Sequence, residues 1–321
     1  MFENIVDGLG ESREQRLANA VTKLSYGIRY LDQATGGIRT HDLVIIGGRT
    51  GAGKTELASI IAQNNALAGK RVLYYALEAE QGEITNRLLF RVFSKIYYDK
   101  IYPKNLKPIS YIDFIDGNYD RQYINEMIQA ETTLRVDFDK LSVFYRNGEF
   151  GIKDLVKSME ESFADTDLFI IDHLHHFDFD GSITELMQIK TAIKTLRDTA
   201  LQLGKPVIVI AHLRKGDRQS KQIVPDLEEF YGSSEISKEA TQVITIAPYD
   251  MDLDKTPYNY PTLFKICKYR KLGSVVKFIG MQSYNAQTNK YDETVILGKL
   301  TDSGTVFEEI KENKPHWSNN L

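Results

Sequence analysis

Eight residues in the first quarter of the chain have the types and spacing that hold a chain of phosphates. Residues 48–55 read GRTGAGKT and satisfy the pattern G-x-x-x-x-G-K-[ST] at every fixed position. Glycines allow backbone conformations in which successive N–H groups point at an anion. In such a loop the lysine carries a mobile charge to the β- and γ-phosphates, and the last hydroxyl reaches Mg²⁺. The motif predicts binding of a nucleoside triphosphate, ATP or another, with Mg²⁺.

The segments on either side of the motif supply the context that it needs. Residues 43–46 form a short apolar strand, and residues 56–63 have the spacing and composition of a buried helix, whose N-terminus adds the positive end of its dipole. We expect the three glycines to take φ values that other residues resist. The predicted nucleotide-binding residues are the whole loop: Gly48, Arg49, Thr50, Gly51, Ala52, Gly53, Lys54 and Thr55.

Hydrolysis also needs a carboxylate near the metal ion. Asp172 ends the apolar run 168–171, which places it at the carboxyl edge of a parallel sheet, beside the phosphate loop. We predict that Thr55 and Asp172 bind Mg²⁺. The alternative is an aspartate that only forms the turn after a strand.

A second carboxylate must orient the attacking water. Many mechanical ATPases place a glutamate directly after the metal-binding aspartate, but here the next residue is His173. Glu78 follows the apolar run 72–77 at the edge where ligands of open α/β sheets gather, and we predict that it is the catalytic acid. Glu80 and Glu83 are alternatives, although their positions suit the first turn of a helix.

Composition restricts the class of protein. The chain has 321 residues, of which 42% are hydrophobic and 26% charged, as in an ordinary globular protein. A net charge of −4 argues against a protein that simply coats nucleic acid. The single cysteine, Cys267, excludes an internal disulfide and a cysteine-based zinc site, so we expect a reducing cytoplasmic setting. No apolar run is long enough to span a membrane, and the N-terminus is not a signal peptide.

The elements that must position these residues alternate along the chain. Near-continuous apolar strands separated by helices predict a mainly parallel sheet flanked by helices, and after residue 260 strands without intervening helices predict an antiparallel extension. We expect an N-terminal arm at 1–25, one domain at 26–312 and a flexible tail at 313–321. The expected strands are 43–47, 72–77, 141–145, 168–172, 206–211 and 242–247. The expected helices are 81–98, 119–134, 151–163 and 183–203.

Taken together, these motifs resemble the helicase domain of the DnaB family within the RecA-like P-loop NTPases, especially the branch of bacteriophage ring helicases and mitochondrial Twinkle. The resemblance runs from about residue 26 to 295. It rests on Thr35-Gly36-Gly37, GRTGAGKT, YYALEAEQGEITNRLL, LFIIDHLHHF, IAHLRK, KYRKLG and GMQSYN, in this order. It implies a hexameric ring that translocates on single-stranded DNA in replication, with a primase or loader protein as a further partner. The protein would act in the cytoplasm of a bacterium or of a phage-infected host.

The resemblance implies roles for three more residues. His212 matches the γ-phosphate sensor, which is Gln or His in the family; otherwise it would be a polar residue at a strand end. Lys268 and Arg270 match the basic pair that reaches the nucleotide site of the neighbouring subunit, where an arginine stabilises transition-state charge. The alternative is two cations on a solvated edge strand.

The segment after His212 matches the family's loop that faces the central channel and holds DNA by its backbone. Its cations suit phosphates, although a basic surface loop is also common without a ligand. The predicted DNA-binding residues are Arg214, Lys215, Arg218 and Lys221.

Some features depart from the family. We expect neither the helical N-terminal domain of DnaB proteins nor the primase-like region of the phage branch in these residues, and we expect the arm to dock on an adjacent subunit. His173, His175 and His176 form a cluster that we interpret as packing and loop polarity, not as a metal site. Two other functions stay open: a RecA- or RadA-like recombinase, and a RecA-fold ATPase that acts on protein partners.

Overall fold

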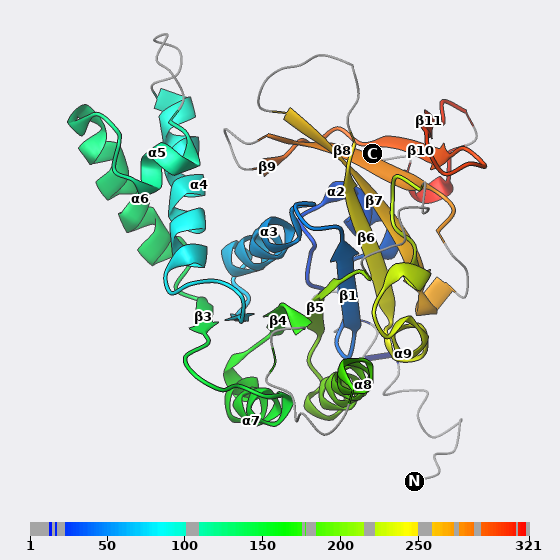
Figure 1. Ribbon diagram of the computed structural model, residues 1–321. Helices are drawn as coiled ribbons and strands as arrows, with labels where there is room; N and C mark the ends of the chain where they lie inside the picture. Colours follow the sequence, from blue (N-terminus) through cyan, green and yellow to red (C-terminus); the bar gives the residue numbers. More distant parts are fainter. Residues whose placement is uncertain are drawn as a thin grey trace.

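The computed structural model of the protein places one large sheet at the centre of the molecule (Figure 1). It describes residues 13–14, 17, 23–100, 109–174, 177, 184–214, 222–249, 259–272, 276–285, 290–312 and 314–318.

Within these residues eleven strands form a single sheet in the order β11-β10-β8-β7-β6-β1-β5-β4-β2-β3, with β9 paired to β8. The parallel part is β1 (Leu43–Gly48), β2 (Val72–Ala76), β3 (Leu141–Tyr145), β4 (Leu168–Asp172), β5 (Val207–His212) and β6 (Gln242–Pro248). The antiparallel part is β7 (Asn259–Tyr269), β8 (Ile279–Asn285), β9 (Lys290–Tyr291), β10 (Ile296–Leu300) and β11 (Phe307–Glu309). The sheet changes from parallel to antiparallel between β6 and β7.

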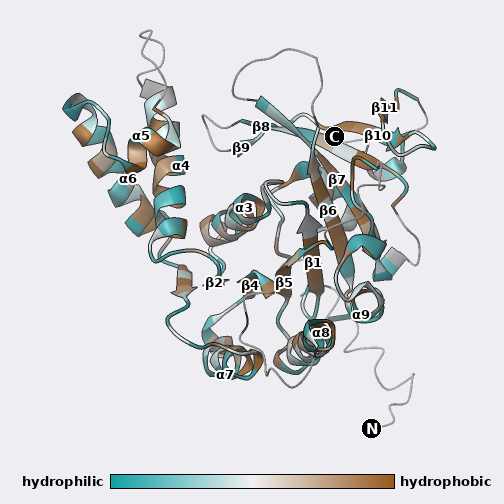
Figure 2. Ribbon diagram, viewed as in Figure 1, coloured by the Kyte–Doolittle hydropathy of each residue, from teal (hydrophilic) through white to brown (hydrophobic). Residues whose placement is uncertain are grey.

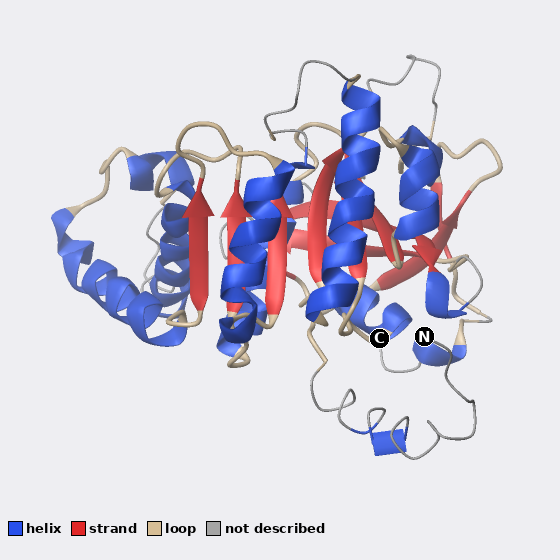
Figure 3. Ribbon diagram, turned by 90° about the horizontal axis from the view of Figure 1, so that it is seen from below, coloured by secondary structure: helices blue, strands red, loops and turns tan. Residues whose placement is uncertain are grey.

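Helices cover both faces of the parallel part (Figures 1 and 3). One face is covered by α2 (Arg29–Thr35) and α3 (Lys54–Leu67), and the other by α7 (Ile152–Ser162), α8 (Glu185–Leu203) and α9 (Ser233–Glu239). β1 shows why its sequence is continuously apolar, since Val44 and Ile46 belong to the core under α3 while Leu43 and Ile45 belong to the core under α8. Figure 2 shows this concentration of hydrophobic residues along the central strands.

A lobe of three helices projects beyond β3 (Figures 1 and 3). It consists of α4 (Glu83–Lys100), α5 (Tyr111–Ile115) and α6 (Ile124–Asp137). Its core is largely aromatic and separate from the two cores that flank the sheet, with Phe90, Phe93, Phe114 and Tyr123 among its members. The lobe is therefore a packed body of its own, attached to the sheet next to β2 and β3.

The predicted fold class is confirmed: the sheet is mainly parallel with helices on both faces, and the C-terminal strands extend it in antiparallel fashion. The short helices α2, α5 and α9 were not predicted as helices. The expected helix at 119–134 begins only at Ile124, after a 3₁₀ turn at Arg121–Tyr123.

The N-terminal boundary of the packed domain lies slightly before the expected one. Leu24 is 5% exposed and belongs to the core under α3. Its backbone N–H and C=O both bond to Ile38. Most of the predicted arm lies outside the described residues, and its docking stays a prediction. No helix in the described part of the chain combines the length and the apolarity needed to cross a membrane.

Candidate active site

Four neighbouring strands bring Lys54, Glu78, Asp172 and His212 to one edge of the sheet. β1, β5, β4 and β2 are adjacent and parallel, so their carboxyl ends meet. Gly48 lies opposite His212 in register, and Ala76 lies opposite Asp172. A cleft of about 540 Å³ opens at this edge. It is lined by Thr50, Gly51, Gly53, Lys54, Thr55, Glu56, Glu78, Ala79, Glu80, Glu83, Arg87, Asp172, His173 and His212.

The phosphate loop runs from the end of β1 to the start of α3, as the motif requires. Gly51 and Gly53 have φ values of 78° and 83°, in the left-handed region that favours glycine. We expected Gly48 also to take such a φ value, and this is wrong, because its φ is not positive. A Cβ atom there would lie 2.9 Å from the carbonyl oxygen of Ile246 on β6, so Gly48 is needed for close packing between strands.

Five of the eight loop residues, all within the described part of the chain, line the cleft: Thr50, Gly51, Gly53, Lys54 and Thr55. Arg49 instead donates a hydrogen bond to the carbonyl of Gln222 at 3.0 Å, and its guanidinium lies 3.6 Å from Glu229. The Arg49 side chain is thus engaged away from the cleft, with Ala52 buried behind the loop.

Lys54 is 6% exposed, and its ammonium donates to the carbonyl of Arg49. Burial lowers its pKa, while the carboxylates of Asp172 and Glu78 oppose this shift. The charge of Lys54 is therefore held at the floor of a cleft whose other charged residues are mostly acidic, and an incoming phosphate would meet it directly.

Asp172 ends β4 at the bottom of the cleft. Its carboxylate accepts a hydrogen bond from the hydroxyl of Tyr74 at 2.7 Å, and the Thr55 hydroxyl also bonds to it. Burial raises the pKa of Asp172 to about 6, with Glu78 adding to the rise and the two hydroxyls and Lys54 opposing it. A hydroxyl and a carboxylate are oxygen ligands of the kind that Mg²⁺ prefers, so Thr55 and Asp172 fit the predicted metal.

Glu78, His173 and His212 lie together beside Asp172. His173 is 3% exposed, and its Nε2 lies 3.0 Å from Oε2 of Glu78 and 3.1 Å from Oδ1 of Asp172. The His173 ring stacks on the His212 ring, with centroids 4.2 Å apart and planes 4° apart. His173 is packed, as our interpretation of packing and loop polarity expects, but it is not merely a polar loop residue, because it lines the cleft. His175 and His176 lie outside the described residues.

This trio can also be considered as a ligand set. The ligating atoms of Glu78, His173 and His212 all lie within 4.8 Å of one another. Two imidazoles and a carboxylate suit transition metals better than Mg²⁺. The oxygen pair of Thr55 and Asp172 remains the better match for Mg²⁺.

The two other candidate glutamates have different surroundings. Glu83 pairs with Arg87 one helical turn later, at 2.8 Å, and its carboxylate accepts a hydrogen bond from the Glu80 N–H at 3.3 Å. These contacts hold the first turn of α4, as expected for acids at a helix N-terminus. Glu78 is the glutamate linked to Asp172, the predicted metal ligand at the end of β4, through His173.

An ion-pair network joins the phosphate-loop helix to the lobe. Glu56, directly after Thr55, is paired with the buried guanidinium of Arg91 and lies 3.6 Å from that of Arg87, both on α4. It also accepts a hydrogen bond from Tyr284 on β8 at 2.9 Å. Burial alone would raise the pKa of Glu56, but Arg91 and its other partners lower it. The network fixes α3 against α4.

The predicted basic pair lies at the opposite edge of the sheet. β7 is antiparallel to β6, with Lys268 opposite Val243, so the end of β7 returns to the amino edge of the parallel strands. A six-residue strand such as β1 spans roughly 20 Å. Arg270 is therefore far beyond hydrogen-bonding distance of the phosphate loop of its own chain.

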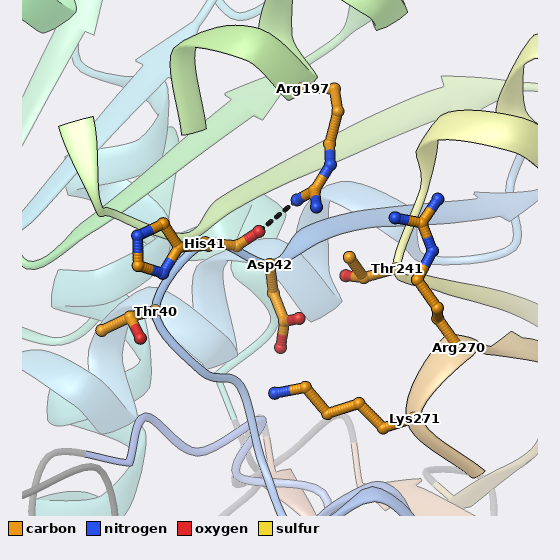
Figure 4. A pocket seen from close by; sticks show the side chains of 7 residues that line it. All are labelled: Thr40, His41, Asp42, Arg197, Thr241, Arg270 and Lys271. Carbon is orange, nitrogen blue, oxygen red and sulfur yellow. Dashed lines mark hydrogen bonds between the residues drawn. The ribbon is translucent and has the colours of Figure 1, made fainter. Parts of the chain in front are cut away.

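Around Arg270 there is a second pocket, of about 350 Å³ (Figure 4). Arg197, Arg270 and Lys271 surround Asp42 in it, and Thr40, His41 and Thr241 complete the lining. Arg197 donates a hydrogen bond to the carbonyl of His41. Burial lowers the pKa of Arg197, and the positive charge of the neighbouring Arg270 lowers it further by repulsion.

Lys268 and Arg270 differ in how they are held. The ammonium of Lys268 donates to the carbonyls of Ser237 and Ala240, both at 2.5 Å, at the C-terminal end of α9. Burial, followed by the charge of Arg270, lowers the pKa of Lys268 to about 8. Arg270 is exposed, and its guanidinium donates a hydrogen bond to the carbonyl of Lys238. Lys268 thus holds a helix end, and Arg270 is the more available cation.

The structure describes only the start of the predicted DNA loop. Leu213 pairs with Phe230, and the exposed Arg214 donates its N–H to the carbonyl of Glu229 at 2.7 Å. Lys215, Arg218 and Lys221 lie outside the described residues, so their contact with DNA stays a prediction.

Sequence reasoning missed three groups in and near the cleft: Tyr74, the network of Glu56 with Arg87 and Arg91, and the place of His173. The contact of Tyr74 with Asp172 could not be predicted from the sequence around Tyr74, because there the residue is one more apolar member of a strand. The position of His173, directly after the predicted metal ligand Asp172 at the end of β4, is the signal that could have placed its side chain in the cleft.

Comparisons with known proteins identify the family and support the fold. The family model described as "DnaB-like helicase C terminal domain" matches residues 23–292. No curated protein sequence matches the chain. Among solved structures, one described as an ATPase domain aligns with a TM-score of 0.70 at 16% identity, covering 92% of this chain and 100% of that one.

A second solved structure is described as "The Structure Of A DnaB-Like Replicative Helicase And Its Interactions With Primase". It aligns with a TM-score of 0.65 at 18% identity and covers 84% of this chain. The chain spans 62% of the length of that protein. At these identities the two structures support the fold.

Proposed function

The chain belongs to the family of DnaB-like helicase C-terminal domains, and from this premise we propose that it is a ring-forming, ATP-driven helicase or translocase on single-stranded DNA. The observation that carries the proposal is the separation of two half-sites. A cleft with phosphate-binding and acidic groups occupies one edge of the sheet, and Arg270 occupies the other. Such a chain completes its site when the cation-rich edge of one subunit meets the cleft of the next.

The roles in the cleft follow from the groups present. Lys54 and the backbone N–H groups of Gly51 and Gly53 bind the phosphates. Thr55 and Asp172 would hold Mg²⁺, which when bound would neutralise charge on the phosphate oxygens. Glu78 orients the attacking water and accepts its proton, and His212 at the end of β5 contacts the γ-phosphate.

Arg270 acts in trans. An arginine that enters the site of a neighbour stabilises the charge that develops on the transferred phosphoryl group. Lys268 is the second member of the pair, although its contacts at the end of α9 favour a supporting position. Hydrolysis then depends on assembly, because a lone subunit lacks this cation.

DNA contact is assigned to the loop that follows His212, through Arg214, Lys215, Arg218 and Lys221. This placement links the strand that carries the γ-phosphate contact directly to the DNA-binding segment. We propose further that the subunits form a hexamer, that the N-terminal arm docks on an adjacent subunit, and that a primase or loader is a partner. The protein would act during replication in a bacterial cytoplasm or a phage-infected host.

The test combines particle images with ATPase rates. Imaging with a non-hydrolysable ATP analogue and single-stranded DNA should show closed rings, and DNA should accelerate hydrolysis. Glu78→Gln should retain ATP without hydrolysing it, whereas Glu160→Gln, an exposed glutamate on α7, should behave as wild type. Open filaments would favour a recombinase, and no DNA binding at low salt would refute both DNA-based functions.

A further inference from the structure

His173 occupies a position in the cleft where it touches both carboxylates of the site. It follows Asp172 at the end of β4, and its Nε2 lies 3.0 Å from Glu78 and 3.1 Å from Asp172. The backbone holds these partners in place, since β2 and β4 pair in register and the Leu77 N–H bonds to the Asp172 carbonyl at 2.7 Å. The separation between the backbones of His173 and Glu78 is therefore set by the sheet.

The orientation of the His173 ring is also set. It packs almost parallel to the ring of His212, which comes from the adjacent strand β5. The side chain is 3% exposed, so there is little room for another rotamer. With its proton on Nε2, the ring directs a single N–H toward the carboxylates, and the Glu78 oxygen is the nearer acceptor.

Glu78 needs such a partner. Its side chain is 49% exposed and has three rotatable bonds, so fixing its carboxylate in one position loses conformational entropy. A general base must lie within hydrogen-bonding distance of the water that it activates. A misplacement of about 1 Å can lower a rate by roughly 100-fold.

We propose that His173 is a positioning residue that orients the carboxylate of Glu78 through its Nε2–H, and that stacking on His212 fixes the direction of this hydrogen bond. The inference rests on the proposed catalytic role of Glu78. It gives a physical reason for a histidine where many mechanical ATPases carry the catalytic glutamate itself: here the glutamate comes from β2, and the residue after Asp172 holds it.

The link to His212 adds a second consequence. His212 is the last residue of β5, and the chain continues from it into the predicted DNA loop. A displacement of His212 would move the ring stacked on it, and with that ring the N–H that holds Glu78. His173 thus connects the segment that would contact DNA to the general base.

The experiment compares variants that retain or remove the N–H donor. His173→Phe keeps a ring against His212 but has no donor, so kcat for ATP should fall roughly 10- to 100-fold. The affinity for a non-hydrolysable ATP analogue should stay within about threefold of wild type. His173→Gln supplies an amide N–H of similar reach and should recover most of the loss. His316→Phe, at an exposed site near the C-terminus, is the matched control and should have no effect.

A double variant decides whether His173 acts through Glu78. If it does, adding His173→Phe to Glu78→Gln should not lower the residual rate further. A further tenfold loss in the double variant, or a wild-type kcat for His173→Phe, would overturn the inference. If His173→Phe does not fold, His173→Gln and His173→Met form a near-isosteric pair that differs in the donor, and the same kcat difference is expected.

The same set separates failure of the inference from failure of the proposed function. Hydrolysis at the wild-type rate by Glu78→Gln would refute the catalytic role of Glu78 itself. If Glu78→Gln does not hydrolyse ATP while His173→Phe is fully active, Glu78 keeps its catalytic role and only the positioning role of His173 is refuted.

Discussion

The two edges of the parallel sheet are built from opposite charges. At the carboxyl edge, five carboxylates and two cations line a cleft behind a glycine-rich loop. At the amino edge, Arg197, Arg270 and Lys271 surround the single carboxylate Asp42 in a smaller pocket. The first edge has groups that suit phosphate and a metal ion, and the second has cations in excess. The two surfaces are complementary to each other, not to themselves.

That difference has a geometric implication for assembly. A contact between two unlike surfaces of the same chain is head-to-tail, and repetition of such a contact gives a closed ring or an open filament. On the proposed function the ring closes, and each cleft receives Arg270 from its neighbour. The following predictions test whether the two edges contribute to one site in this way.

The largest effect is expected at the carboxyl edge. Lys54→Ala removes the buried cation at the floor of an acidic cleft and should abolish nucleotide binding or turnover. A titration with a fluorescent ATP analogue and an ATPase assay measure this. Lys70→Ala, beyond the other end of α3, is the control. Binding by Lys54→Ala within about threefold of wild type would contradict the assignment.

At the amino edge, Arg270→Ala should leave nucleotide binding intact but lower hydrolysis in the assembled state by about 1,000-fold. Mixing it with Glu78→Gln should partly restore the rate, because an intact cleft then faces an intact Arg270. Lys157→Ala, a 75%-exposed lysine on α7, serves as control. Normal hydrolysis by assembled Arg270→Ala would show that the two edges do not share a site.

The pKa of Asp172 gives a test without nucleotide. Burial raises this pKa to about 6, so the folded protein binds the proton more readily than the unfolded chain. Protonated Asp172 therefore contributes to the unfolding free energy below about pH 4, and this contribution is lost as the pH rises through 6. Without Mg²⁺, Asp172→Asn should therefore be more stable than wild type at pH 7, by up to roughly 3 kcal/mol.

The difference in unfolding free energy between Asp172→Asn and wild type should shrink as the pH is lowered from about 7 to about 4. Urea unfolding at several pH values measures it. Asp165→Asn, at a 93%-exposed site, should show no such trend. If the difference in unfolding free energy between Asp172→Asn and wild type does not depend on pH, the pKa of Asp172 is not raised.

The smallest effect concerns Lys268, whose ammonium bonds to two carbonyls at the end of α9. Lys268→Met should lower the unfolding free energy of the isolated chain by about 1.5 kcal/mol. Lys238→Met, at a 68%-exposed site on the same helix, should not. If Lys268→Met is as stable as wild type but hydrolyses slowly in the ring, Lys268 belongs with Arg270 in the neighbour's site.

The sequence predicted the strands well because burial on both faces leaves a continuous apolar run that ends where the strand ends. The residues at those ends, Asp172 and Glu78, could be placed for the same reason. α5 and α9 span only 5 and 7 residues. Segments of that length show too little periodicity to distinguish a helix from a loop.

Contacts across strands could not be predicted in the same way. Whether His173 meets Glu78 depends on β2 and β4 being neighbours, and the sequence between them contains β3 and the helices of the lobe. The bonds of Lys268 to α9 likewise depend on how β7 returns along β6. Spacing along one chain indicates which strand a residue ends, but not which side chain lies across from it.

The pairing of Glu56 with Arg91 has a mechanical consequence. α4 is anchored to α3 by this buried pair, and the chain just before α4 carries Glu78. The aromatic core packs α4 against α5 and α6, so a force on these helices acts on α4. On the proposed function, such a force reaches Glu78 through the chain and Thr55 through Glu56. A partner that binds the lobe would therefore also act on residues of the cleft.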